Sequence, residues 1–158
     1  MILQIVGFKN SGKTTMMTYA VRFFKSLGYQ VTTIKHHGHM GEEIELPRAT
    51  LDHMKHFNAG ADQSIVQGHA YMELVKRDNE STLETLIQDY GTIENNIILI
   101  EGYKQAQYDK VILYRNPNEY EQLKQLQNIV FEIDVSQSDD IEAQLKQKLK
   151  LWIENKGE

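Results

Sequence analysis

Cysteine is absent from this sequence of 158 residues, so the chain has no disulfide, no cysteine nucleophile and no cysteine-ligated zinc or iron–sulfur site. Proline is scarce as well, with 2 residues, and no Gly/Ser-rich linker or internal repeat divides the chain. A chain of this length buries enough surface to fold without cross-links. We therefore expect one compact domain over residues 1–158.

A basic surplus is missing too. The formal net charge is -5, whereas general nucleic-acid binders usually carry a basic surplus or stripe. No apolar run approaches the roughly 20 residues that a membrane-spanning helix needs. Residues 1–6 lead into a glycine loop without the charged and apolar regions of a secretion signal. These absences predict a cytoplasmic protein that binds neither nucleic acid nor membranes.

The chain does contain strand-like and helix-like segments in alternation. Aliphatic or β-branched runs predict strands at residues 2–6, 31–34, 63–67, 71–76, 97–100, 111–114 and 129–133. Helical spacing and capping signals predict helices at residues 13–27, at about 49–58, from Ser81 toward Tyr90, and from near Asp139 onward. This order predicts an α/β fold of three layers, with a mostly parallel central sheet and flanking helices.

Residues 7–14 match the phosphate-binding pattern G-x-x-x-x-G-K-[ST]. The motif follows a predicted strand and opens a predicted amphipathic helix, which is the context that it requires. Its glycines let backbone N–H groups curl around a phosphate, Lys13 would reach the β and γ phosphates, and the Thr14 hydroxyl would bind Mg²⁺. The predicted nucleotide-binding residues are Gly7, Lys9, Asn10, Ser11, Gly12, Lys13, Thr14 and Thr15. We therefore expect one P-loop NTPase domain.

Glu101 directly follows the most apolar run in the chain, residues 97–100, as a Walker B acid does. A carboxylate at the end of a central strand can hold the Mg²⁺ shell or orient a water molecule. The alternative is a surface glutamate at a strand end. We predict Lys13 and Glu101 as the catalytic pair, and Thr14 and Glu101 as the Mg²⁺ ligands.

Three histidines, His36, His37 and His39, follow the second predicted strand, where a loop faces the nucleotide crevice of a doubly wound sheet. They bind either a transition metal or phosphate, backbone and water. The acidic residues that follow supply either a Mg²⁺-shell ligand or a solvated face: Glu42, Glu43, Glu45 and Asp52. Arg115 follows a predicted strand, and three alternatives are open for its partner: a phosphate, another protein, or a surface carboxylate in an ion pair.

Four ordered segments of the chain carry a resemblance to a known family: residues 7–15, 34–36, 59–61 and 100–104. They resemble the glycine-rich loop ending in Gly-Lys-Thr-Thr, the Ile-Lys-His, the Ala-Gly-Ala and the Glu-Gly-Phe-Lys of the molybdopterin-guanine dinucleotide biosynthesis adaptor family, MobB. Tyr103 replaces the phenylalanine. The resemblance implies a homodimer that binds GTP with Mg²⁺, hydrolyses it weakly, and assists a nucleotidyltransferase in joining GMP to the molybdenum cofactor.

The resemblance also places His36 near the nucleotide or the pterin, and the candidates for a second ligand site are His36, His39, Asp52 and Arg115. Of the family's Gly-Lys-Asp-Ser only Asp52 is retained. No Asn-Lys-x-Asp sequence that would specify guanine is present, so ATP stays an alternative to GTP. Other hypotheses are a metallochaperone GTPase that uses the loop of residues 36–39, a small-molecule kinase, and a nucleotide-binding protein without turnover.

Overall fold

The computed structural model describes residues 1–37, 43–78, 80–137 and 140–157. It divides into two compact units, the first formed by Met1–Gly38 and Leu83–Glu158 and the second by His39–Thr82. That residues 1–158 form one nucleotide-binding domain stays a prediction beside this division into units. His39 and Glu42, which belong to predicted sites, lie outside the described residues.

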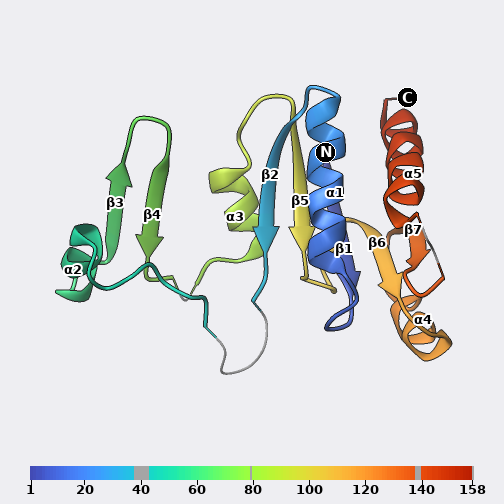
Figure 1. The fold of residues 1–158 in the computed structure, drawn as a ribbon, viewed down its shortest axis with the longest axis horizontal. Helices are drawn as coiled ribbons and strands as arrows, with labels where there is room; N and C mark the ends of the chain where they lie inside the picture. Colours follow the sequence, from blue (N-terminus) through green and yellow to red (C-terminus); the bar gives the residue numbers. More distant parts are fainter. Residues whose placement is uncertain (38–42, 79, 138–139, 158) are drawn as a thin grey trace. The chain divides into compact units, whose positions relative to one another are not determined.

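The first unit is built on a five-stranded sheet with the order β2-β5-β1-β6-β7, in which every neighbouring pair is parallel (Figure 1). Its strands are β1 (Ile2–Gly7), β2 (Gln30–Lys35), β5 (Asn96–Glu101), β6 (Asp109–Tyr114) and β7 (Ile129–Asp134). Because the strands are parallel, their carboxyl ends meet at one edge of the sheet, and Gly7, Glu101 and Tyr114 lie along it. The predicted α/β fold with a mostly parallel sheet is confirmed.

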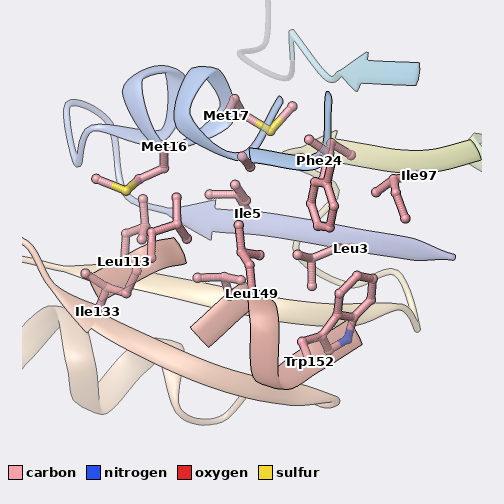
Figure 2. Packing of buried hydrophobic residues seen from close by; sticks show 14 residues of the cluster. Leu3, Ile5, Met16, Met17, Phe24, Ile97, Leu113, Ile133, Leu149 and Trp152 are labelled. Atoms are coloured by element: carbon pink, nitrogen blue, oxygen red, sulfur yellow. The ribbon is translucent and has the colours of Figure 1, made fainter. Parts of the chain in front are cut away.

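Helices cover both faces of this sheet because successive strand residues point to opposite sides. On one face, Leu3 and Ile5 pack with helices α1 (Lys13–Ser26) and α5 (Ile141–Lys156) in one apolar cluster (Figure 2). On the other face, Val6 packs with Leu123 of α4 (Pro117–Leu123), and Ile98 packs with Leu83 of α3 (Leu83–Tyr90). The result is the three-layer arrangement that the alternating pattern predicts.

The helix α5 closes the larger core with the apolar stripe that the sequence indicates. Leu145 and Leu149 are fully buried, and the ring of Trp152 meets Phe24 edge to face at 6.1 Å between centroids (Figure 2). The indole N–H of Trp152 donates a hydrogen bond of 2.7 Å to Asp109, which satisfies its one polar atom. Asp140 caps the helix by accepting from the backbone N–H of Ala143 at 3.0 Å.

The second unit contains the helix α2 (Asp52–Asn58) and an antiparallel hairpin of β3 (Gln63–Gln67) and β4 (Met72–Lys76). Its small core consists of Met54, Phe57 and Val75. Both strands were predicted, while α2 begins three residues after the expected start at 49. No helix that could span a bilayer occurs in the described part of the chain.

Two helix starts differ from the sequence-based predictions. α3 begins at Leu83, and Ser81, expected to cap it, instead donates hydrogen bonds to Asp78. α4 was not predicted, although its signal is present in the sequence: Asn116 accepts from the backbone N–H of Glu119 at 3.0 Å, and Pro117 occupies the first helical position.

Leu149→Ala should lower the free energy of unfolding by about 2–5 kcal/mol, because it opens a cavity beside a side chain with 0% exposure. The matched control on the same helix is Leu151→Ala, whose side chain is 53% exposed, and it should change stability by no more than about 0.5 kcal/mol. Urea unfolding followed by circular dichroism measures both. Equal losses for the two variants would contradict this packing of α5.

Candidate functional site

The loop between β1 and α1 has a backbone conformation that needs glycine or asparagine at particular positions. Asn10 and Gly12 have φ angles of 60° and 79°, in the left-handed region that glycine and asparagine tolerate best. A Cβ on Gly7 would overlap the Ser11 hydroxyl and lie 2.9 Å from the carbonyl oxygen of Leu113. The glycines of the motif are thus required by a tight turn and by a close approach to β6.

Lys13 begins α1 and reaches back across this loop, where its Nζ donates a 2.6 Å hydrogen bond to the carbonyl oxygen of Phe8. Burial lowers the pKa of Lys13; Glu101 opposes that shift, while Lys104, Lys35 and Arg115 add to it. Among the residues that the structure describes, four cations therefore lie around one loop, and Glu101 is the acid that acts on Lys13. Such a field favours an anion at the N-terminal end of α1.

Glu101 ends β5 as predicted and is buried, with 8% exposure. Its Oε2 accepts from the Thr14 hydroxyl at 3.5 Å, and its Oε1 lies 3.7 Å from the Nζ of Lys35. The two residues predicted to share Mg²⁺ are thus brought together from elements 87 positions apart. Two hard oxygen donors side by side suit that ion.

The segment after β5 folds back over the strand ends through two consecutive residues with positive φ, Gly102 at 97° and Tyr103 at 48°. The amide of Gln4, fully buried on β1, donates to the carbonyl oxygens of Gly102 and Tyr103 at 3.2 and 2.9 Å. The Tyr103 ring stacks on His36 at 4.4 Å between centroids and 24° between planes. A pocket of about 410 Å³ opens here and is lined by Gly7, Lys13, His36, Gly102, Tyr103, Lys104, Gln105 and Ala106.

Arg115 follows β6 and forms an ion pair with Glu119 of α4, so a carboxylate is its principal partner in this structure. Its Nη1 also donates to the carbonyl oxygen of Asn10 at 3.5 Å. The hydrogen bond from Arg115 holds the pKa of Glu119 below its ordinary value. Arg115 therefore links the phosphate loop to the beginning of α4.

The remaining predicted residues are placed less centrally. Lys9 and Thr15 are exposed on the phosphate loop and the first turn of α1. Asp52 belongs to the second unit, where it pairs with Lys55 at 2.8 Å, and its second-site role stays a prediction. Within the part of the chain that the structure describes, no group of three or more histidine or acidic side chains is arranged to hold a metal.

Several residues that shape the site were not among the predicted site residues: Gln4, Tyr103, Lys104 and Glu119. Gln4 had a visible signal, since it is the polar residue inside the apolar run of residues 2–6. Glu119 had a signal as well, since it stands four residues after Arg115 and three after Asn116, but that spacing points to a contact only once α4 is recognised as a helix.

Comparisons with known proteins identify relatives of this chain. The family model MobB, described as molybdopterin guanine dinucleotide synthesis protein B, matches residues 2–134. A Bacillus subtilis protein named probable molybdopterin-guanine dinucleotide biosynthesis adapter protein is 38% identical over 123 residues, covering 78% of this chain and 70% of the relative. The Escherichia coli adapter protein is 27% identical, and the alignment spans 73% of this chain and 66% of that relative.

A crystal structure of a MobB homolog from Bacillus stearothermophilus resembles the fold with a TM-score of 0.70 at 25% identity. The match covers 95% of this chain and 98% of that one. The likeness therefore extends well beyond the phosphate loop.

Glu119→Gln should lower stability at neutral pH, since it removes the charge that Arg115 binds. Because the folded pKa of Glu119 is depressed, its contribution is present above the unfolded value of about 4.3 and is lost as pH falls through the folded pKa. Urea midpoints of the wild type and the variant should converge in acid. Glu121→Gln, on the exposed side of α4, is the control, and a difference that persists unchanged in acid would contradict the pairing.

Proposed function

This chain belongs to the MobB family of molybdopterin guanine dinucleotide synthesis proteins, and from that premise we propose that it is a GTP-binding adaptor with weak GTPase activity. It binds GTP with Mg²⁺ at the phosphate loop and assists a partner nucleotidyltransferase that joins GMP to the molybdenum cofactor. The observation that carries the proposal is the Thr14 hydroxyl 3.5 Å from the Glu101 carboxylate, at the N-terminal end of α1.

The phosphate site supports the nucleotide part of the proposal. The triphosphate is a polyanion, and the loop offers it backbone N–H groups, the positive end of a 14-residue helix and the Lys13 ammonium group. Lys13 exchanges its bond to the Phe8 carbonyl for the β and γ phosphates, so the loop loses one internal contact and gains a charge-assisted one. Lys35, Lys104 and Arg115 add favourable charge around the same position.

Thr14 and Glu101 fit Mg²⁺, because a hydroxyl and a carboxylate oxygen already lie within 3.5 Å of each other. Bound there, Mg²⁺ would neutralise charge on the phosphate oxygens. The Glu101 carboxylate, held at the end of β5, would also orient the attacking water. The arginine nearest the loop is tied to Glu119 and so is only partly available to the γ phosphate, which is consistent with slow hydrolysis.

The proposal of a partner enzyme rests on the names of the relatives, which are called adapter proteins of molybdopterin-guanine dinucleotide biosynthesis. An adaptor acts on another protein, and the enzyme of matching chemistry is one that transfers a GMP unit. We also propose a homodimer, as the family resemblance implies. GTP is proposed over ATP because the family resemblance implies it, and the two nucleotides are compared by titration.

Calorimetric titration with GTP and Mg²⁺ should show one site per chain, and Lys13→Ala should weaken it by roughly tenfold or more, because a charged hydrogen bond is worth about 1.5–3 kcal/mol. Lys25→Ala, at the other end of α1 and exposed, is the control that should bind like the wild type. ATP binding as tight as GTP would instead favour the kinase hypothesis. Absence of nucleotide binding in the wild type would overturn the proposal.

Glu101→Gln should slow GTP hydrolysis by about 10- to 100-fold, because the substitution replaces the carboxylate that would contact Mg²⁺ and the attacking water with a neutral amide. The rate is measured as phosphate release under saturating GTP and Mg²⁺. Glu94→Gln, an exposed residue just before β5, should hydrolyse GTP at the wild-type rate. Equal rates for the wild type and both variants would mean that Glu101 takes no part in turnover.

A further inference from the structure

Another pocket, of about 520 Å³, lies between α5 and β7 and is called the α5–β7 pocket below. β7 is the last strand of the sheet, and α5 packs beside it (Figure 1). The residues that line the pocket are Asp109, Val130, Phe131, Lys148, Leu151, Trp152, Asn155 and Lys156. Among the described residues it shares none with the pocket beside Lys13. The α5–β7 pocket is therefore separate from the candidate nucleotide site.

One wall of the α5–β7 pocket is apolar and is formed by an irregularity of β7. Lys110 of β6 pairs with Ile129. The next residue of β6, Val111, pairs with Phe131, so Val130 is an extra residue in the strand, a β-bulge. Bulges re-aim side chains, which explains how the consecutive residues Val130 and Phe131 both line one pocket. A bulge on an edge strand also discourages a further strand from pairing there, so the pocket suits a small molecule better than an added strand.

The opposite wall comes from one face of α5. Lys148, Leu151, Trp152 and Asn155 line it, and their spacing of three and four residues places them on the same side of the helix. Leu151 is exposed although it is apolar, as is Val130 on the other wall. From residue 148 to residue 155 the helix rises by roughly 10 Å at about 1.5 Å per residue. That length limits the size of a molecule that fits along this face.

The carboxylate that lines the pocket is fully engaged within the chain. Asp109 accepts a 2.7 Å hydrogen bond from the indole N–H of Trp152, and its Oδ2 also lies 2.9 Å from the Nζ of Lys156. A second cation brought to this carboxylate would compete with Lys156. The pocket therefore offers little to a positively charged ligand.

Lys148, two turns earlier on α5, is in a different position. Its Nζ lies 5.7 Å from the centre of the Phe131 ring, and no carboxylate among the described residues forms an ion pair with it. By contrast, Lys146 and Lys150 on the same helix each pair with a glutamate. A lysine that lines a pocket and lacks an acidic partner favours an anion there.

We propose that the α5–β7 pocket binds a small amphiphilic carboxylic acid. Its apolar body covers Val130 and Leu151, which removes exposed apolar surface from water, and its carboxylate pairs with Lys148. The volume of about 520 Å³ is within the range of small-molecule sites. The nucleotide site takes no part in this proposal, which therefore stands independently of the proposed function. Two sources share this chemistry, an aromatic acid and a short-chain fatty acid.

The test uses the full chain and two probes, 4-phenylbutyrate and octanoate, each compared with its neutral amide. Trp152 is the only tryptophan of the chain and lines the pocket, so its fluorescence reports on this site alone. Both acids should change that fluorescence saturably, and calorimetry should give one acid per chain without relying on the indole signal. Each amide should bind roughly fivefold more weakly than its acid, as expected for the loss of one partly exposed charge pair.

Two lysine variants test the placement of the carboxylate. Lys148→Gln should abolish the preference for the acid over the amide. Lys150→Gln makes the same change on α5 outside the pocket lining and should keep that preference. Leu151→Ala removes apolar contact at an exposed position and should weaken acid and amide alike, by roughly threefold to tenfold.

Binding of only one of the two acids supports the site and identifies the kind of apolar body that it accepts. Three results would overturn the proposal: no binding of either acid, amides that bind as tightly as the acids, or equal effects of Lys148→Gln and Lys150→Gln. Unchanged affinity in Leu151→Ala would likewise contradict the placement of the apolar body. Binding of the acids by a chain that fails to bind GTP would leave this pocket standing while the nucleotide function fails.

Discussion

The contact between Gly7 and its neighbours governs the geometry of the site. At this position β1 ends against the backbone of Leu113 on β6 and the side chain of Ser11, and a side chain on Gly7 would fill the space between them. The loop then turns within a few residues to Gly12, the left-handed N-cap after which α1 begins at Lys13. With β1 in the centre of the sheet, residues from β5 reach this loop on one side and residues after β6 reach it on the other. Glu101 and Arg115 are brought to one phosphate loop in this way.

Charge around the loop is divided between the two sides. On the β5 side, Glu101 faces Thr14 and Lys35, so an acid lies where oxygen ligands for a cation are needed. On the β6 side, Glu119 occupies Arg115 and leaves it a weaker contact with the loop. Burial lowers the pKa of Lys13, Glu101 opposes that shift, and repulsion from the surrounding cations adds to it; an anion bound there would relieve that repulsion. The cations around the loop repel one another when no ligand is bound, so the site favours a ligand of negative charge.

Buried polar groups hold the segment after β5, which lines the pocket beside Lys13. Gln4 and Lys110 belong to neighbouring strands and both donate to carbonyl groups of the segment after β5. An apolar residue at either position would leave those carbonyls without these donors, so the strands specify the course of the loop as well as the core. The left-handed conformation of Tyr103 is compatible with folding because these bonds, together with the stacked His36, hold it.

Local patterns in the sequence determined much of the fold. The alternation of apolar runs with helical stripes gave the parallel sheet and most of its elements, since period and capping are properties of a few consecutive residues. The phosphate loop and Glu101 were identifiable for the same reason, because the loop follows β1 and Glu101 ends β5. The helix α4 was not predicted, because a 7-residue helix shows too little periodicity. Its capping residue Asn116 and the following Pro117 are nevertheless typical of a helix start.

Only the tertiary structure decided which distant residues share the site. Thr14 meets Glu101, Gln4 meets Tyr103, and His36 stacks on Tyr103 because the strand order places β1 beside β5 and β5 beside β2. The division into two units, likewise, depends on which segments pack together over long separations. Such contacts arise from packing between elements far apart in the chain, and no local pattern of residues encodes them.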